Sequence, residues 1–534
     1  MQAADVIATR LFQAGCRYAF GIPGGEVLTI IDALRRAGIE VVLTKHENAA
    51  GFMAEATYHS TGAPGILIAT VGPGIANAVN SIANAYQEHV PLIVISGCID
   101  AADRLTYTHQ VFDHGALLQP VVKATFEAAP NACDVMIDKA LAIAMDARPG
   151  PVHIDLPIDV ATSDHTQPRG ALRRPVAVAA PAPGDDLSDA LSMFAGAERP
   201  VMMVGVDVIA QPAAKDAIRA FSRRYEIPVI TTYKAKGIVD ETDPLSLGGH
   251  GLSPRSDTLI LDFLKRADLV ISLGYDPIEM RQGWRNPWEP ENAIEFVSAP
   301  NVHYMHFAKH SWITDVASGL EVLATAGRQR AAWADGFVQE TRSRLMAAFK
   351  ADDRWGPSQA IEVIASACPN DAVLTLDSGA HRILTSQKWS CSEPQTLLQS
   401  TCLCTMGCAL PLAAGFKLAS GNRTVVALMG DACLDMVMGE LTTLRDRKLA
   451  VVVIVFVDGS LSLIELKQRA SGFQNLSVDF QSTDYASIAS SFEGNGFTVD
   501  NVSDLSDAMG KSISSDVFSL IAVRIPRRAY DGLF

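Results

Sequence analysis

Residues 429–464 read MGDACLDMVMGELTTLRDRKLAVVVIVFVDGSLSLI, a pattern typical of a β–α–β unit. An apolar strand ends at Gly430 and Asp431, a helical stretch follows, and a second apolar strand ends at Asp458 and Gly459. A right-handed crossover makes two such strands parallel, so both carboxylates should lie at the carboxyl edge of one sheet. Ligands of open α/β sheets bind at this edge.

Asp431 and Asp458 are therefore candidate ligands of Mg²⁺, which takes few protein carboxylates and completes its octahedron with phosphate oxygens and water. Gly430 lets the backbone come close to a phosphate, and the amide end of the following helix should point to the same place. The alternative is that both aspartates are ordinary turn residues after strands. The spacing alone leaves both interpretations open.

The same alternation of apolar strands and helical stretches extends over the whole chain. It predicts an α/β fold of three consecutive units with parallel sheets, at residues 1–165, 186–328 and 355–534. Residues 161–185, rich in Pro, Ala and Arg, are predicted to be a linker, and 328–355 a connecting helix. The strands are expected at residues 41–44, 65–69, 90–96, 152–155, 200–206, 227–232, 269–273, 372–376, 424–429, 451–457 and 518–523.

Composition restricts the class of protein. The 534 residues are 48% hydrophobic and 19% charged, which excludes intrinsic disorder. With 44 basic and 59 acidic residues the net charge is −15, which disfavours a nucleic acid partner. The nine cysteines include the cluster Cys402, Cys404 and Cys408, whose spacing matches no zinc module, and they suit a reducing compartment. We therefore expect a cytoplasmic protein with no signal peptide and no membrane span.

A second candidate site lies near the N-terminus. Glu47 follows a predicted strand within VVLTKHENAAG (41–51), among small and apolar neighbours that suit proton exchange with a bound heterocycle. The alternative is that Glu47 is an ordinary acidic residue in the first turn of a helix, where a negative charge is stabilising. A zinc-protease motif is excluded because Ala50 stands where the second His would be. The turn in ATVGPGIANA (69–78) fits neither the P-loop nor the dinucleotide glycine pattern.

Five motifs then follow one another along the chain: FGIPGG, KHENAAGFMAEA, ATVGPGIANAVNSIANAYQEHVPLIVISG, CTMGCALPLAAG and GDA. In this order they resemble the thiamine-diphosphate-dependent enzymes of the acetolactate synthase, pyruvate oxidase and benzoylformate decarboxylase group. The resemblance covers nearly the whole chain and is nearest to the flavin-free catabolic acetolactate synthases.

The resemblance implies a different role for each of the three units. The first would bind the aminopyrimidine of thiamine diphosphate, the third would bind Mg²⁺ and the diphosphate, and the middle one would be a Rossmann-like spacer. It also implies an active site between the first unit of one chain and the third unit of another, hence a homodimer or homotetramer.

Carried over by motif, Glu47 would hydrogen-bond the pyrimidine ring nitrogen and promote the imino tautomer that deprotonates the thiazolium carbon. Gln110, in THQVFDH, matches an active-site Gln of the synthases. The neighbouring His109 would face either the substrate or the solvent.

On the metal side, Asp431 and Asp458 would be Mg²⁺ ligands, with the backbone carbonyl of Ser460 as a third. Met406 matches the large apolar residue that supports the bent cofactor. The candidate cofactor-binding residues are Pro23, Gly24, Pro73, Asn77, Gly379, Ala380, His381, Met406, Gly430 and Ala432.

Three features depart from the common family pattern. Val457-Asp458 replaces the usual Asn-Asn, and Asp at this position is familiar from the catabolic synthases. Gly459 and Leu461 stand where relatives carry pocket-shaping side chains. Glu465 is one residue from the position of a Glu in simple decarboxylases, a rotation of about 100° on a helix, so we interpret it as structural.

The segment GYDPIEMR (274–281) resembles the flavin-free synthases, and we expect no FAD. The alternative interpretation of its charges is an exposed ion pair between Asp276 and Arg281.

The expected activity is decarboxylation of a 2-oxo acid and carboligation of the acyl unit to a second carbonyl, as a transferase or lyase. One alternative is a decarboxylase that releases an aldehyde. A second alternative is a non-catalytic homologue that serves as a structural or regulatory subunit, but such a protein need not keep Glu47, Asp431 and Asp458 together. The sequence does not identify the donor or the acceptor.

Overall fold

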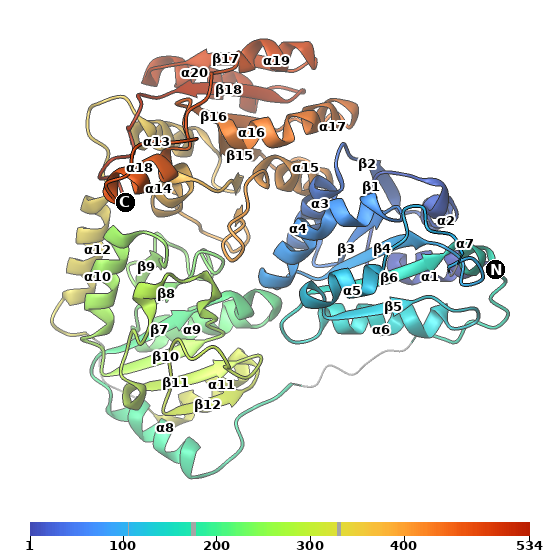
Figure 1. Cartoon of the computed structure of the whole chain (residues 1–534). Helices are drawn as coiled ribbons and strands as arrows, with labels where there is room; N and C mark the ends of the chain where they lie inside the picture. The colour runs from blue at the N-terminus through green and yellow to red at the C-terminus, as the bar shows by residue number, and fades with distance from the viewer. Residues whose placement is uncertain (105, 172–177, 328–332) are drawn as a thin grey trace.

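The structure is a computed structural model that describes residues 1–104, 106–171, 178–327 and 333–534. It contains three six-stranded sheets, and every pairing between neighbouring strands is parallel. This confirms the predicted α/β class. Figure 1 shows the first sheet in blue and cyan, the middle one in green and yellow, and the third in orange and red. The predicted linker falls partly on residues 172–177, which lie outside the described residues.

The first sheet has the strand order β2-β1-β3-β4-β6-β5. Its central strands are buried along their whole length, as expected where helices cover both faces of a parallel sheet. The strands are β1 (Tyr18–Gly21), β2 (Glu40–Leu43), β3 (Gly65–Ala69), β4 (Leu92–Cys98), β5 (Ala124–Glu127) and β6 (Pro151–Pro157). The helices are α1 (Ala3–Gln13), α2 (Leu28–Ala37), α3 (Glu47–Thr61), α4 (Pro73–Gln87), α5 (His114–Leu118), α6 (Cys133–Met145) and α7 (Ile158–Thr162), with short 3₁₀ turns η1 (Gly25–Val27) and η2 (Gln119–Val121).

The middle sheet has the order β12-β11-β10-β7-β8-β9, which is the doubly wound order with its switch point between β7 and β10. The strands are β7 (Pro200–Val204), β8 (Val229–Thr231), β9 (Ser246–Gly249), β10 (Leu269–Leu273), β11 (Ala293–Val297) and β12 (His310–Ile313). The helices are α8 (Asp185–Gly196), α9 (Ala214–Tyr225), α10 (Pro254–Leu264) and α11 (Val316–Leu323), with η3 (Val206–Ala210), η4 (Pro277–Glu279), η5 (Gln282–Trp284), η6 (Pro290–Asn292) and η7 (Ala324–Ala326). The predicted connecting helix at 328–355 is α12 (Phe337–Ala348), while residues 328–332 of that range lie outside the described residues.

The third sheet, β14-β13-β15-β16-β18-β17, repeats the strand order of the first. The strands are β13 (Val373–Leu376), β14 (Leu397–Gln399), β15 (Val425–Gly430), β16 (Val452–Val457), β17 (Asn495–Val499) and β18 (Ser519–Arg524). The helices are α13 (Pro357–Ala367), α14 (Ala380–Lys388), α15 (Ala409–Ser420), α16 (Asp431–Val437), α17 (Leu441–Asp446), α18 (Ser462–Ala470), α19 (Tyr485–Ser491) and α20 (Val502–Ile513), with η8 (Met438–Glu440).

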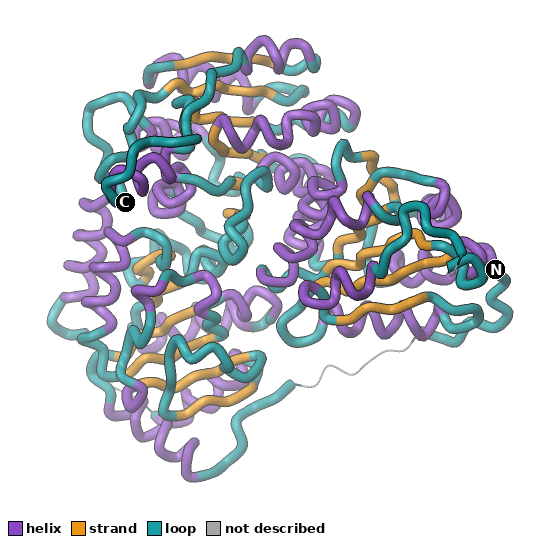
Figure 2. The backbone as a smooth tube through the Cα atoms, viewed as in Figure 1, coloured by secondary structure: helices purple, strands orange, loops and turns teal. Residues whose placement is uncertain are grey.

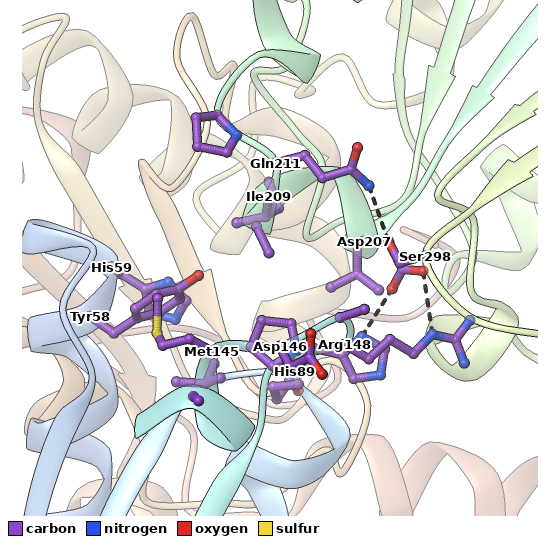
Figure 3. A pocket seen from close by; sticks show the side chains of 18 of the residues that line it. Tyr58, His59, His89, Met145, Asp146, Arg148, Asp207, Ile209, Gln211 and Ser298 are labelled. Carbon is purple, nitrogen blue, oxygen red and sulfur yellow. Dashed lines mark hydrogen bonds and ion pairs between the residues drawn. The ribbon is translucent and has the colours of Figure 1, made fainter. Parts of the chain in front are cut away.

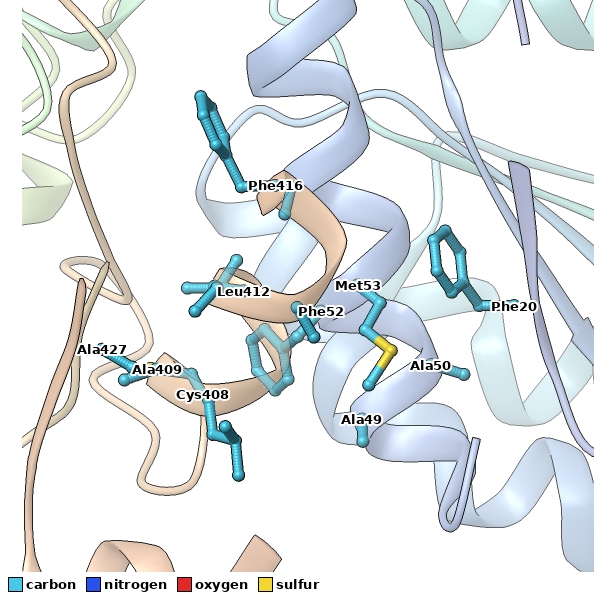
Figure 4. Packing of buried hydrophobic residues seen from close by; sticks show 14 of the residues in the cluster. Phe20, Ala49, Ala50, Phe52, Met53, Cys408, Ala409, Leu412, Phe416 and Ala427 are labelled. Carbon is cyan, nitrogen blue, oxygen red and sulfur yellow. The ribbon is translucent and has the colours of Figure 1, made fainter. Parts of the chain in front are cut away.

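The first and third units share one hydrophobic core, built where α3 lies against α15. Figure 4 shows Phe52 and Met53 of α3 beside Leu412 of α15. The two helix backbones approach closely, because a Cβ on Gly415 would lie 2.2 Å from the carbonyl oxygen of Met53. Since α3 begins at Glu47, this packing fixes the position of that residue relative to the third unit.

Figure 2 shows the helices arranged around the three sheets. Within the described ranges, no helix combines the length and the apolar character that crossing a bilayer requires.

Candidate functional site

Asp431 and Asp458 follow two adjacent parallel strands, as the sequence predicts. Asp431 comes directly after β15 and Asp458 directly after β16, and the two strands are paired in register. The Asp431 carboxylate accepts hydrogen bonds from the backbone N–H groups of Asp458 (3.2 Å) and Gly459 (2.9 Å). The structure therefore brings the two residues together at the carboxyl edge of the sheet.

The two carboxyl groups lie where ionisation is costly. Burial raises the pKa of Asp431, which is only 2% exposed. Burial and the nearby Asp431 charge also raise the pKa of Asp458 to about 6, although a hydrogen bond from Ser462 opposes this. Two acidic oxygens that repel each other in a partly buried turn are stabilised by a divalent cation. The donor set therefore fits Mg²⁺.

Ser460 lies in the same turn. Its backbone N–H donates to Asp458 Oδ1 (3.3 Å), and its hydroxyl donates to Asp479 Oδ1 (3.0 Å). The side chain is thus directed to Asp479, and ligation of a metal by the backbone carbonyl of Ser460 stays a prediction. Ala432 follows at the start of α16, and its N–H donates to Asp431 Oδ1 (2.9 Å).

His381 lies against Gly379 and Gly430, two of the predicted cofactor-binding residues. A Cβ on Gly379 would lie 2.5 Å from His381 Cε1, and one on Gly430 would lie 3.3 Å from it. The His381 Nε2 atom is buried and has no hydrogen-bond partner among the described residues. Burial, assisted by the charge of Arg382, lowers the pKa of His381 to about 3, so the ring is neutral. A neutral ring that carries its proton on Nε2 can donate this N–H to a phosphate oxygen beside Gly430.

Gly379 and Ala380 occupy the start of α14, and both lie at the carboxyl end of β13. This end belongs to the same sheet edge as Asp431, because β13 pairs with β15. The predicted diphosphate residues and the predicted metal ligands therefore share one edge of one sheet.

Glu47 is the first residue of α3 and is 6% exposed. Its Oε2 accepts a hydrogen bond from the Asn77 side-chain amide of α4 (3.1 Å). Its Oε1 lies beside the first turn of that helix, since a Cβ on Gly74, the second residue of α4, would lie 3.5 Å from it. Pro73 is the first residue of α4, a position where its missing N–H costs nothing. Pro73 and Asn77, predicted to bind the cofactor, thus form one group with Glu47.

The FGIPGG turn reaches the same edge of the first sheet. A Cβ on Gly24 would lie 2.4 Å from the methyl carbon of Thr70, so only glycine permits this contact. Pro23 precedes it and is exposed. The turn therefore lies beside the end of β3, next to the Gly72–Gly74 turn.

Gln110 and His109 lie on an exposed loop. Gln110 has a φ of +62°, and its carbonyl oxygen would lie only 2.6 Å from a Cβ on Gly72. The loop therefore packs directly on the turn that precedes α4. His109 makes a ring contact with Tyr107, with centroids 6.3 Å apart, which places it at the loop surface.

Met406 lies at the edge of the core that the first and third units share. The neighbouring backbone is held by Asp377, which the sequence analysis did not identify. The fully buried Asp377 carboxylate accepts hydrogen bonds from the N–H groups of Gly407 and Ala409, both at 2.9 Å. The signal that could have identified it is its position directly after a buried strand, the same signal that identified Asp431.

Glu440 is a second residue that the sequence analysis missed. It comes from the third unit, and its Oε1 accepts the backbone N–H groups of Lys45 (2.8 Å) and His46 (3.2 Å). It thus holds the segment that leads to Glu47. We call Glu47 and Asn77 the Glu47 group, and Asp431, Asp458 and Ser460 the Asp431 group. Within the described part of the chain, no hydrogen bond or ion pair joins these two groups.

Glu465 is held by residues other than Asp431 and Asp458. Its carboxylate, 2% exposed, accepts hydrogen bonds from Arg469, Asn475 and Arg528 at 2.8 to 3.0 Å. Although burial opposes ionisation, these bonds hold the pKa of Glu465 below its usual value. Its contacts are those of a residue that fastens α18 to the C-terminal segment, in agreement with the structural interpretation.

A large cavity of about 1480 Å³ lies between the first and middle units (Figure 3). Arg148 of the first unit pairs with Asp207 (3.3 Å) and with Asp276 (3.1 Å) of the middle unit, and His89 Nδ1 lies 3.2 Å from Asp207. Asp276 is 6% exposed. The interpretation of an exposed Asp276–Arg281 pair is therefore wrong: Asp276 is buried, and its cationic partner comes from another unit.

Comparisons with known proteins agree with this geometry. Residues 1–117 match the thiamine pyrophosphate enzyme N-terminal TPP binding domain, 187–323 the central domain and 377–523 the C-terminal TPP binding domain. The chain is 32% identical over 543 residues to acetolactate synthase isozyme 1 large subunit of Escherichia coli, covering 98% of this chain and 93% of that protein. It is 28% identical over 529 residues to the acetolactate synthase of Bacillus subtilis (96% and 91% covered), and 27% identical over 550 residues to the catabolic acetolactate synthase of Raoultella terrigena (98% and 95% covered).

Three parallel sheets, with Glu47 at the carboxyl edge of the first and Asp431 at that of the third, are typical of α/β proteins that bind a ligand at these edges. The matches cover all three units in order and specify that ligand as thiamine diphosphate. The chain belongs to the thiamine pyrophosphate enzyme family.

Proposed function

We propose that this protein decarboxylates a 2-oxo acid and joins the remaining acyl unit to a second carbonyl, in the manner of the acetolactate synthases. The observation that supports this most is the meeting of Asp431 and Asp458 at two adjacent strand ends, with the His381 ring beside Gly430 and its Nε2 unpartnered among the described residues. The nearly full-length likeness to acetolactate synthases supports the carboligation outcome.

Thiamine diphosphate would supply the carbanion that attacks the oxo acid and the electron sink that makes loss of CO₂ possible. The protein would supply the ligands of the metal, the groups that move the proton and the geometry of the site. Asp431, Asp458 and the carbonyl of Ser460 would ligate Mg²⁺. His381 would hydrogen-bond the diphosphate.

Glu47 would exchange a proton with the ring nitrogen of the aminopyrimidine. Within the described ranges its carboxylate accepts one hydrogen bond, from Asn77 to Oε2, so the buried Oε1 is available for that contact. Gln110, on the exposed loop against Gly72, would donate its amide N–H to the substrate carboxylate. Pro23, Gly24 and Met406 would shape the walls around the cofactor rings.

We further propose that the enzyme uses no flavin. In a doubly wound sheet a dinucleotide binds at the switch point, here between β7 and β10. The buried carboxylates of Asp207 and Asp276 lie at this point. They are already paired with Arg148 and His89 of the first unit. Introducing a pyrophosphate there would require breaking this ion cluster and would place like charges together.

The active enzyme is proposed to be a homodimer or a homotetramer. Within the described part of one chain the Glu47 group and the Asp431 group have no direct link, although both line sheet edges that bind parts of one cofactor. A second chain that turns its third unit toward the first unit of its partner would complete the site. The three units at residues 1–165, 186–328 and 355–534 would then be the pyrimidine-binding, central and diphosphate-binding domains.

The test is an assay of the purified protein with thiamine diphosphate, Mg²⁺ and pyruvate. We expect CO₂ and acetolactate, in a ratio of one to one, with two pyruvates consumed. Free acetaldehyde without acetolactate would instead support the decarboxylase alternative. If the protein binds the cofactor but turns over neither pyruvate nor larger 2-oxo acids, the non-catalytic alternative holds and the proposal fails.

A further inference from the structure

A buried polar network lies beneath the turn that leads into α4. His114, at the start of α5, is 3% exposed, and His153 of β6 is fully buried. His114 Nδ1 lies 2.7 Å from Asp155 Oδ1, and Ser96 donates to the same oxygen (2.7 Å). His153 contacts Ser96 through Nε2 (2.6 Å) and Thr125 through Nδ1 (2.7 Å). The network joins β4, β5, β6 and α5.

The hydrogen bonds decide which nitrogen of His114 carries the proton. Its Nε2 accepts the backbone N–H of Gly72 (3.3 Å), so the proton must be on Nδ1, where it is donated to Asp155. The His114 and His153 hydrogen bonds hold the pKa of Asp155 below its usual value despite its burial. Although these three residues lie close enough to hold a metal ion, each already has partners within the protein, so the network is complete without one.

Gly72 lies between the Gln110 loop and the helix α4, whose Asn77 binds Glu47. It adopts a φ of +71° and precedes the first residue of α4, the helix whose Asn77 holds Glu47. The backbone of Gln110 packs against it so closely that no Cβ fits between them. A shift of Gly72 would therefore move the Gln110 loop and the Glu47–Asn77 pair at the same time.

We infer that His114 is a positioning residue, which holds the Gly72 turn, and through it Glu47 and Gln110, in the arrangement that catalysis requires. The carboxylate of Asp155 fixes the ring, and the ring fixes the backbone N–H of Gly72. The hydrogen bonds of the His114 ring go to Asp155 and Gly72, so its effect on Glu47 and Gln110 is exerted through the backbone. The link to catalysis rests on the proposed function, but the link to the turn does not.

The test compares three variants of the full-length protein. His114→Leu cannot accept the Gly72 N–H, whereas His114→Gln keeps one donor for Asp155 and one acceptor for Gly72. Thr125→Val is the matched control, because it removes a hydrogen bond from the far end of the network, at His153, without touching Gly72. Hydrogen exchange of the cofactor-free protein, measured by mass spectrometry on peptides covering residues 70–78, reports the turn itself.

We expect faster exchange in that segment for His114→Leu only. With cofactor and pyruvate, the kcat of His114→Leu should fall by roughly 10- to 100-fold, since small displacements of catalytic groups have effects of this size. His114→Gln should restore most of the loss, and Thr125→Val should keep wild-type kcat. Unchanged exchange in His114→Leu, or an equal effect in all three variants, would overturn the inference. An inactive wild-type protein would overturn the proposed function, while the exchange data would still decide the role of His114.

Discussion

Glu47→Gln is expected to slow exchange of the C2 proton of bound thiamine diphosphate by roughly 10²- to 10⁴-fold, the range typical of general acid–base catalysis. The amide has nearly the shape of the carboxyl group and can still contact Asn77. It cannot, however, take up and return a proton. Product formation should fall with the exchange rate, and Mg²⁺-dependent cofactor binding should be retained. The exchange is measured by NMR after quenched incubation in D₂O.

The control for Glu47 is Glu127→Gln. Glu127 is an exposed carboxylate of the same unit, which pairs with Arg104 at 2.9 Å on the surface. Its replacement should leave exchange and turnover unchanged. A Glu47→Gln protein that exchanges the C2 proton at the wild-type rate would show that another group performs the proton transfer.

Asp431→Ala is expected to abolish cofactor binding at ordinary Mg²⁺ concentrations. The substitution removes one proposed metal ligand and also the acceptor that holds the backbone of Asp458 and Gly459 in place. Even outer-shell partners of metal ligands contribute about 10- to 100-fold to affinity, so the loss of a direct ligand should exceed that range. Calorimetric titration of thiamine diphosphate in the presence of Mg²⁺ measures the effect.

The matched variant is Asp446→Asn, an exposed aspartate of α17 on the same crossover that pairs with Arg445 and Lys45. It should bind the cofactor as the wild type does. Equal affinities of the Asp431→Ala and wild-type proteins would remove Asp431 from the metal site.

The fold was largely predictable because buried parallel strands are continuous apolar runs. The strands β3, β4, β15 and β16 are found within two residues of their predicted positions. The strands that were missed include β5 and β12, whose side chains are alternately exposed and half-buried at sheet edges. Such strands do not form an apolar run, and β14 has only three residues.

The candidate site was predictable where a functional side chain comes directly after a strand, as for Asp431 and Asp458. Contacts between distant segments were not. The pairing of Asp276 with Arg148, the support of the Lys45–His46 backbone by Glu440, and the hydrogen bond between His114 and Gly72 join residues far apart in sequence. No local pattern encodes these contacts, because they depend on how the units and loops pack.

The central claim is that Asp431 and Asp458 hold one divalent ion that anchors the cofactor diphosphate. Its most direct test is a crystal structure with thiamine diphosphate and Mn²⁺ in place of Mg²⁺, because Mn²⁺ gives an anomalous signal. We predict one anomalous peak bonded to oxygens of both aspartates and of the diphosphate, at about 2.0–2.2 Å, close to Mg²⁺–oxygen distances. A bound cofactor whose metal lies elsewhere, with the two aspartates unliganded, would contradict the account.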